Sequence, residues 1–284
     1  MADNSRFYES AWLKWSWANT HSEIFKQYLV AWRNDPNRDR GIDLEKRYNP
    51  KRRCIVVSVA KIKALPTEWG LVLGDIVHNY RSALDCIAWA LVEQGKRPPS
   101  TLTEKEQDGV YFPICDSRDW FNNTFRAKLP GVGKAEVAVV RRYQPYKTGK
   151  RLRHFHAFWV LNRLSNNDKH RAVQPVLAIP ESASYKITYV RDCEVTKLSG
   201  QFRAQTLEVY AELAPIYVRK TGPYPDVEVQ GELRAFPAVE DVRLDDWLTK
   251  TDDNVVSLLK RLSDPPTELL AKLDPGFVVA PASH

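Results

Sequence analysis

The sequence predicts an α+β protein, with a helical bundle core in the first two thirds and an antiparallel β-sheet and a final helix in the last third. Two observations predict this class. Apolar residues recur at helical spacing through the first two thirds, and a period-two alternation follows, first at Tyr185, Ile187 and Tyr189. We expect residues 1–180 to form a mainly helical domain with one or two strands. Residues 181–284 should be a β-rich region with a C-terminal helix, either separate or packed with the first as one unit.

The N-terminal segment predicts a long helix followed by a strand. The helix should span Phe7 to Arg33 and stop at Asn34-Asp35-Pro36-Asn37, a cluster of turn-forming residues. Its core candidates are the large apolar residues Trp12, Trp15, Phe25, Tyr28, Leu29 and Trp32. Arg53 to Ile62 alternates as a strand does, and Pro66 then breaks the chain ahead of the next helix.

A helix predicted from Asp75 to Glu93 carries two different faces. At 100° per residue, the apolar face contains Ile76, Tyr80, Ala83, Leu84, Ile87 and Leu91. The opposite face contains His78, Arg81, Ser82 and Asp85. This polar stripe is either a solvated face, a structural network in which Asp85 neutralises Arg81, or a chemical site. Its residue types suit a partly buried network, because exposed helix faces are usually rich in Lys and Glu.

The middle of the chain predicts a loop and two shorter helices. Gly95 to Gly109 is polar with paired prolines and should be a surface loop. Asp116 should be the N-cap of a helix through Phe121 and Phe125. Another short helix should follow Gly133 and end at Gln144-Pro145-Tyr146.

A helix predicted from Arg151 to Arg171 would carry a second polar stripe. Along this helix, one face would hold His156, Arg163, Asn167 and His170. Polar side chains on two otherwise apolar helices find hydrogen-bond partners more easily when the two polar stripes face each other. We therefore expect the two helices to pack together, so that His78, Arg81 and Asp85 lie near Asn167, Asp168 and His170.

The last third predicts strands and one helix. Alternation at Leu207, Val209, Ala211 and Leu213, and again at Val227 and Val229, is typical of half-exposed antiparallel strands. We expect Tyr185 to Phe236 to form an antiparallel sheet. Asp252 should cap a final helix that Pro265-Pro266 would close.

Charge is concentrated in one stretch. The chain has a net charge of +7, yet Arg141 to Arg171 alone has nine basic residues against one acid, a net of +8. Aromatic residues are interleaved there, namely Tyr143, Tyr146, His154, Phe155, His156 and Trp159. This combination indicates phosphate contact with base stacking. Alternatively, Gly222 to His284, with six basic and twelve acidic residues, folds back on it.

Several classes of protein are excluded. Gly131-Val132-Gly133 lacks the remainder of a dinucleotide-binding loop, and there is no P-loop, H-E-x-x-H or G-x-S-x-G motif. The four cysteines are far apart, so we expect no metal and no cofactor. No apolar run approaches the roughly 20 residues that span a bilayer, and the N-terminus lacks a signal pattern. The expected compartment is the cytoplasm, with no membrane partner.

Two segments of the chain carry a resemblance. Asp75 to Asp85 together with Asn167 to Arg171 resembles a pair of motifs found in uncharacterised bacterial and phage proteins, in which the first reads G-D-x-x-H-N-L-R-S-A-L-D-H. It covers about the middle third of the chain and names no activity. More distantly, the chain is similar to HEPN domains, helical bundles of which many are metal-independent ribonucleases that act as dimers in toxin and antiphage systems. Arg81 matches the arginine of the HEPN motif, whereas Cys86 stands in place of its histidine.

The resemblance implies RNA cleavage only if another histidine supplies the missing group. His78 or His170 would transfer protons, Arg81 would hold the phosphate and Asp85 would orient Arg81. The predicted catalytic residues are therefore His78, Arg81, Asp85 and His170. The predicted nucleic-acid contacts are the basic residues Arg142, Lys147, Lys150, Arg151, Arg153, Arg163, Lys169 and Arg171. The expected partners are RNA or single-stranded nucleic acid, and a second copy of the chain in a homodimer. The alternative is a non-catalytic nucleic-acid or protein-binding accessory whose His/Arg/Asp network is structural.

Overall fold

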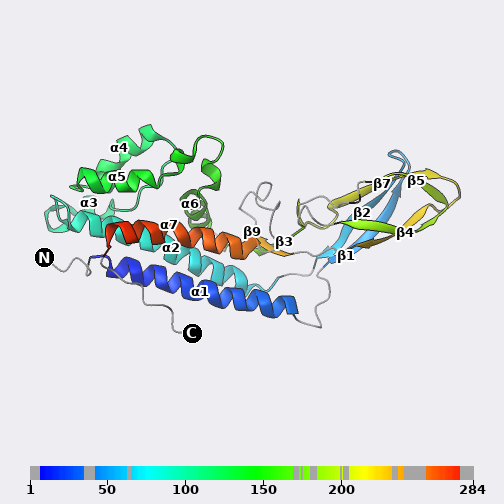
Figure 1. Cartoon of the computed structure of the whole chain (residues 1–284), viewed down its shortest axis with the longest axis horizontal. Helices are drawn as coiled ribbons and strands as arrows, with labels where there is room; N and C mark the ends of the chain where they lie inside the picture. The colour runs from blue at the N-terminus through cyan, green and yellow to red at the C-terminus, as the bar shows by residue number, and fades with distance from the viewer. Residues whose placement is uncertain are drawn as a thin grey trace. The chain divides into compact units, whose positions relative to one another are not determined.

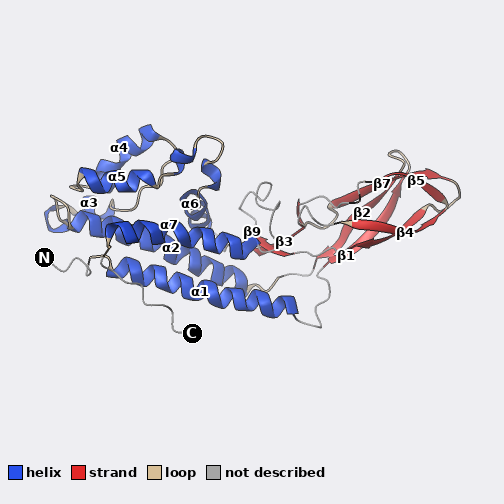
Figure 2. Cartoon of the chain, in the orientation of Figure 1, coloured by secondary structure: helices blue, strands red, loops and turns tan. Residues whose placement is uncertain are grey.

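A computed structural model describes most of the chain, namely residues 7–34, 42–62, 65–168, 173, 175–179, 184–198, 200, 205–231, 236–239 and 254–275. Helices dominate the first part of the chain and strands the later part, before a final helix (Figure 2). The α-helices are α1 (Glu9–Asn34), α2 (Glu68–Glu93), α3 (Glu104–Asp108), α4 (Arg118–Lys128), α5 (Lys134–Arg142), α6 (Ala157–Asp168) and α7 (Asn254–Leu273). The strands are β1 (Ile42–Asn49), β2 (Cys54–Ile62), β3 (Pro175–Ile179), β4 (Tyr185–Arg191), β5 (Cys193–Lys197), β6 (Gln205–Thr206), β7 (Glu212–Lys220), β8 (Asp226–Gly231) and β9 (Phe236–Val239) (Figure 1). The predicted α+β class is confirmed.

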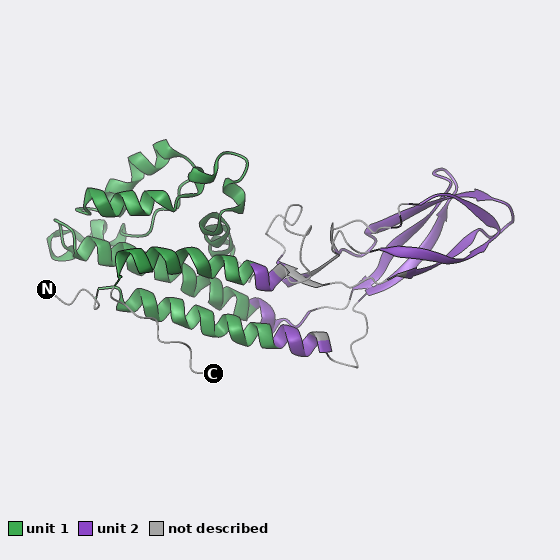
Figure 3. Cartoon of the chain, viewed as in Figure 1, with its two compact units in different colours: residues 1–27, 71–173, 258–284 green, residues 28–70, 174–257 purple. Residues whose placement is uncertain are grey.

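The chain forms two compact units, and neither is continuous in sequence. Unit 1 contains residues 1–27, 71–173 and 258–284, and unit 2 contains residues 28–70 and 174–257 (Figure 3). The boundaries fall within α1, α2 and α7. Both units therefore include residues from either side of residue 180.

In unit 1, α1, α2 and α7 lie side by side and are joined by polar side chains (Figure 1). The hydroxyl of Tyr80 on α2 donates a hydrogen bond to Oδ1 of Asn19 on α1, at 3.0 Å. The hydroxyl of Ser263 on α7 donates to the same oxygen, at 2.9 Å. Trp12 on α1 donates from its indole to Asp274, just beyond α7, at 3.2 Å. Apolar residues of all three helices are buried alongside, so these bonds fix the register of a hydrophobic bundle.

An extended segment in unit 1, residues 110–115, passes between α2 and the end of α5. Gln144, which is fully buried, accepts a hydrogen bond from the backbone N–H of Cys115 at 2.9 Å and donates to the carbonyl of Pro113 at 2.8 Å. Phe112 is also fully buried, and its ring packs edge-on against Phe158 of α6. This segment therefore contacts both the end of α5 and the helix α6.

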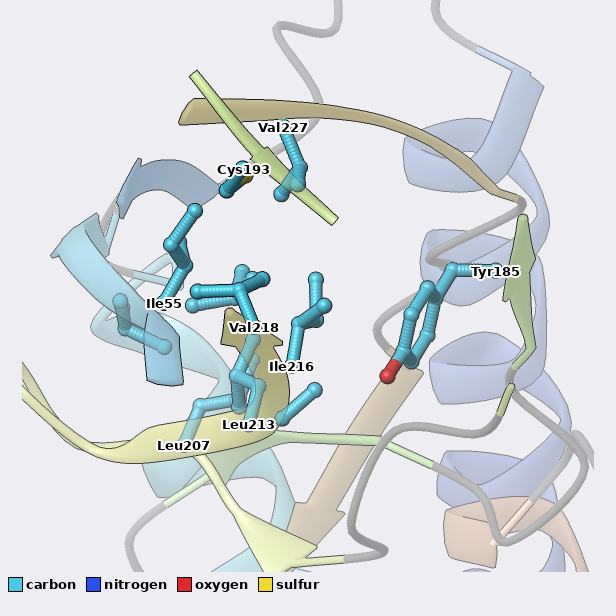
Figure 4. Close-up of a cluster of buried hydrophobic side chains, with 11 residues drawn as sticks. Ile55, Tyr185, Cys193, Leu207, Leu213, Ile216, Val218 and Val227 are labelled. Atoms are coloured by element: carbon cyan, nitrogen blue, oxygen red, sulfur yellow. The ribbon is translucent and has the colours of Figure 1, made fainter. Parts of the chain in front are cut away.

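The strands of unit 2 all pair antiparallel, as the period-two alternation predicted for the later part of the chain. A four-stranded sheet has the order β1-β2-β7-β5, a three-stranded sheet has the order β6-β3-β9, and β4 pairs with β8. Side chains from β2, β4, β5, β7 and β8 share one apolar core (Figure 4). Lys46 of β1 donates to the carbonyl of Val227 at 2.7 Å, so the β4–β8 pair is also tied to the four-stranded sheet through polar contacts.

Several helix boundaries differ from the predicted ones. α2 begins at Glu68 rather than at Asp75. The helix expected from Arg151 begins only at Ala157, after a short 3-10 turn at Arg153–Phe155, so His156 precedes α6. Its predicted end, together with Lys169, His170 and Arg171, lies outside the described residues. The N-cap of α4 is Ser117 rather than Asp116. α7 continues through Pro265 and Pro266 instead of closing there, because buried leucines on both sides, Leu262 and Leu269, hold the helix in the bundle.

Two other segments were also predicted wrongly. The expected loop Gly95 to Gly109 contains α3, whose N-cap Thr103 forms a reciprocal capping box with Glu106. The expected strand through Leu207 and Leu213 is interrupted by a turn at which Tyr210 has a φ of 70°. The predicted cap at Asp252 lies outside the described residues. Within the described part of the chain, no helix combines the length and hydropathy needed to cross a bilayer.

Candidate functional site

The polar stripe of α2 is bound to the backbone of the protein itself. Arg81 Nη2 donates to the carbonyl oxygen of Phe112 at 3.1 Å and lies 3.1 Å from Asp85 Oδ1. The same Asp85 oxygen accepts the N–H of Phe112 at 2.9 Å. The two charged side chains therefore hold both polar groups of one residue, and they fix the segment 110–115 against α2. We call Arg81, Asp85 and the peptide groups of Phe112 the arginine clip.

Burial explains the electrostatics of the arginine clip. The side chain of Arg81 is only 13% exposed, and this desolvation lowers its pKa, an effect that the carboxylate of Asp85 opposes. Nη1 of Arg81 is buried and has no hydrogen-bond partner among the described residues. A guanidinium in this environment depends on its carboxylate, because an uncompensated charge would be costly to bury.

His78 lies one turn before Arg81, on the same helix, and is exposed. Its Nε2 is 3.4 Å from the hydroxyl of Ser82. The charge of Asp168 interacts with His78 and with Asp75. Burial raises the pKa of Asp168, the negative charge of Asp75 raises it further, and His78 lowers it. His78 and Asp168 therefore form a second, more exposed group of titratable side chains.

Asp168 also marks the point at which α6 meets α2. A Cβ atom added to Gly74 would lie 2.4 Å from Oδ1 of Asp168, so the end of the Asp168 side chain lies directly against the backbone of α2 at this glycine. The predicted contact between the two helices is thus confirmed at their adjoining ends. Arg81 and Asp85 contact the segment 110–115. His170 lies outside the described residues.

The basic segment has a different character. Four of the predicted nucleic-acid contacts are exposed, namely Arg142, Lys147, Lys150 and Arg151. Arg153 and Arg163 are partly exposed, as is Arg141 at the end of α5. None of these seven cations forms an ion pair with a carboxylate in the described part of the chain. We call these seven side chains the basic surface.

Aromatic rings hold several of these cations in place. The guanidinium of Arg163 lies 5.5 Å from the ring centroid of Trp159, and that of Arg141 lies 5.4 Å from the ring of Phe121. Arg153 donates from Nε to Nε2 of His154 at 3.4 Å and from Nη1 to the carbonyl of Asp116 at 3.4 Å. Arg141 also donates from Nη2 to Oδ1 of Asn122 at 3.2 Å, and its Nε is buried. These cations are therefore oriented without being neutralised.

His156 is a structural residue at the start of α6. Its Nδ1 accepts the N–H of Phe158 at 3.2 Å, as an N-cap residue does, and its ring packs edge-on against the ring of Phe158. Burial lowers the pKa of His156 to about 4. His156 is consequently neutral at physiological pH, and it is a partly exposed cap residue rather than a member of the predicted polar stripe.

Sequence reasoning missed three contributors to these sites. Gln144 fixes the segment that the arginine clip holds, and Gly74 admits Asp168. The positive charge of Arg118, in the first turn of α4, acts on Tyr146 together with that of Arg141, and so extends the basic surface onto α4. The excess of basic residues in the sequence was located at Arg141 to Arg171 and did not include Arg118. Gly74 stands at the first position of the G-D-x-x-H-N motif, although its contact with Asp168 was not predicted. Gln144 has no local signature, because its role arises from contacts distant in sequence.

Nothing in the described residues forms a metal site, since no group of three or more His, Cys, Asp or Glu side chains is suitably gathered. Comparisons of the chain with protein-family models, with curated proteins and with solved structures found no match.

Proposed function

We propose that the protein binds RNA or single-stranded nucleic acid through the basic surface, as an accessory in which the arginine clip is structural. The observation that carries this proposal is the net charge of +8 between Arg141 and Arg171, combined with the lack of ion pairs to described carboxylates. Unneutralised cations attract phosphate and release its counterions on binding. Binding of this kind is largely independent of sequence and weakens steeply with salt.

The acidic C-terminal region does not offer an internal substitute for phosphate in its described part. Glu268 of α7 accepts a hydrogen bond from the hydroxyl of Tyr143, at 3.5 Å, rather than pairing with a cation. Arg261 of α7 donates to the carbonyl of Phe155, at 2.9 Å, and so adds a further positive charge beside the basic surface. These contacts favour an external partner over an internal one.

A second candidate function is metal-independent RNA cleavage, in a toxin or antiphage system, by a HEPN-like protein acting as a homodimer. His78 favours it, because this histidine is exposed beside Asp168, whose raised pKa suits an acid. The role proposed for Arg81 is opposed by its engagement with Phe112 and Asp85. Phosphate would have to replace partners that the fold already uses.

The binding proposal is tested by reversing charge on the basic surface. A variant with Lys150, Arg151 and Arg153 changed to Glu should lose most of its affinity for an RNA oligonucleotide and show a shallower dependence on salt. The matched control changes Lys51, Lys61 and Lys220 to Glu, since these exposed lysines of unit 2 give the same change in net charge. Equal losses in both variants, or no binding by the wild type, would overturn the proposal.

The cleavage candidate is tested separately. RNA turnover should be followed in EDTA for the wild type and for Arg81→Ala, His78→Ala and His170→Ala. Turnover abolished by His78→Ala or His170→Ala, in protein that remains folded, would establish the ribonuclease. Turnover that no substitution alters, with binding retained, leaves the accessory function.

A further inference from the structure

Most aromatic residues of the basic segment are used inside the protein. Tyr143 is buried against Phe158, and its hydroxyl bonds to Glu268. The ring of Tyr146 packs against Phe121, and its hydroxyl is buried. His156 caps α6, as described above. These side chains therefore contribute to the packing of unit 1.

One pair of partly exposed rings lies between two cations of the basic surface. His154 and Trp159 are both partly exposed, and they meet edge to face with their centroids 4.6 Å apart. Arg163 lies over the Trp159 ring, and Arg153 donates to the His154 ring. A continuous row of cation, imidazole, indole and cation is thus assembled from residues on the 3-10 turn and on α6. We call these four residues the aromatic cluster.

The aromatic cluster suits an unpaired base better than a duplex. In a duplex the bases stack on one another, so a protein reaches only their edges and the phosphates. In a single strand each base can present a face to an aromatic ring or a guanidinium plane, while cations on both sides contact the neighbouring phosphates. Both kinds of group are present here, in alternation.

We propose that the nucleic acid is bound as a single strand, with an unpaired base against Trp159 and His154 and with Arg153 and Arg163 on the adjacent phosphates. This inference rests on the proposed function and adds to it the strandedness of the ligand and the residues that select it. The shared chemistry is an unpaired base beside phosphate, which RNA and single-stranded DNA both offer.

The experiment compares oligouridylate, oligothymidylate and blunt RNA and DNA duplexes of about 20 nucleotides, longer than the roughly 4–16 nucleotides that a single-strand site covers. Wild type should bind a single strand at least about tenfold more tightly than the corresponding duplex. Trp159→Leu should lose about tenfold on single strands and keep its duplex affinity and salt dependence, whereas Trp159→Phe should retain most of the binding. The stronger of the two single-stranded probes shows which of RNA and single-stranded DNA is bound more tightly.

A second test variant and a matched control complete the experiment. His154→Ala removes a ring from the turn before α6 and should weaken single-strand binding even if Trp159→Leu fails to fold. Trp17→Leu is the matched control, because Trp17 is 57% exposed on α1 and has its own ring contact with His21. Equal wild-type affinity for strands and duplexes, or unchanged single-strand binding in Trp159→Leu and His154→Ala, would overturn this inference while leaving phosphate binding intact. Absence of binding by the wild type, or binding that neither salt nor charge reversal weakens, would instead contradict the proposed function.

Discussion

Unit 1 contains two regions, the arginine clip and the basic surface, in which arginine side chains have opposite roles. Arg81 in the arginine clip is 13% exposed, pairs with Asp85 and donates to a backbone carbonyl of the same protein. The arginines of the basic surface have no carboxylate partner among the described residues, and Arg141 and Arg163 lie beside aromatic rings. The difference teaches that an arginine's partners, more than its position on a helix face, separate a structural charge from a binding charge.

The strongest contrast between the regions should come from truncating their arginines. Arg81→Ala leaves Asp85 without its cation and the Phe112 carbonyl without its donor, so we expect a loss of about 2–4 kcal/mol in the free energy of unfolding. Urea denaturation measures it. The double variant Arg81→Ala with Asp85→Ala should lose less than the sum of the two single losses, because the pair acts together. A loss below about 0.5 kcal/mol for Arg81→Ala would show that the arginine clip does not hold the fold.

The contact between α2 and α6 can be tested at Gly74. In Gly74→Ala the added methyl group would lie 2.4 Å from Oδ1 of Asp168, so the end of that side chain must turn aside, and we expect a loss of about 1 kcal/mol in the free energy of unfolding. In an Asp168→Ala background the methyl group has room, and the better helix propensity of alanine should make the same change neutral or stabilising. An equal loss in both backgrounds would contradict the contact.

His156 should make stability depend on pH. Its pKa is about 4 in the folded protein and 6.5 in the unfolded chain, so the unfolded state alone takes up a proton between these values. The stabilisation is complete above pH 6.5 and is lost as the pH falls towards 4. Because the ring is partly exposed, we expect a decrease of about 1–2 kcal/mol over this range.

Replacement by asparagine isolates this effect. His156→Asn retains a side chain that can cap α6 but does not titrate. The difference in unfolding free energy between wild type and His156→Asn should therefore change between pH 6.5 and 4 and stay constant above pH 7. A constant difference throughout would show that His156 is not desolvated in the fold.

The smallest effect on stability is expected at the basic surface. Arg151 is exposed and forms no ion pair with a described residue, so Arg151→Ala should change the unfolding free energy by less than about 0.5 kcal/mol. The same variant should weaken binding of single-stranded RNA measurably. A destabilisation comparable to that of Arg81→Ala would remove the contrast between the two regions.

Periodicity in the sequence predicted the fold class, the long helices and the antiparallel strands, because these follow from local patterns of burial. It failed where contacts distant in sequence decide the outcome. α7 passes through Pro265 and Pro266 because Leu262 and Leu269 are buried on either side, and the turn at Tyr210 replaces a regular alternation. The rules that proline ends a helix and that alternation indicates a strand take account only of local conformational preference.

The candidate sites were predictable to a similar degree. Spacing correctly grouped Arg81 with Asp85, and composition located the basic surface, since both are properties of neighbouring residues. The sequence did not reveal that Phe112 is the partner of the arginine clip, that His156 is a cap, or that Trp159 and His154 are the exposed rings. Each of these depends on which segment packs against which.

The measurement that tests the central claim most directly is the affinity for single-stranded RNA as a function of salt, for wild type and for the variant with Lys150, Arg151 and Arg153 changed to Glu. Wild-type affinity should fall linearly on a log–log plot, and the variant should have both a lower affinity and a slope shallower by about 2. The result that would contradict the account is wild-type binding that ignores salt, or a variant that binds with the wild-type affinity and slope.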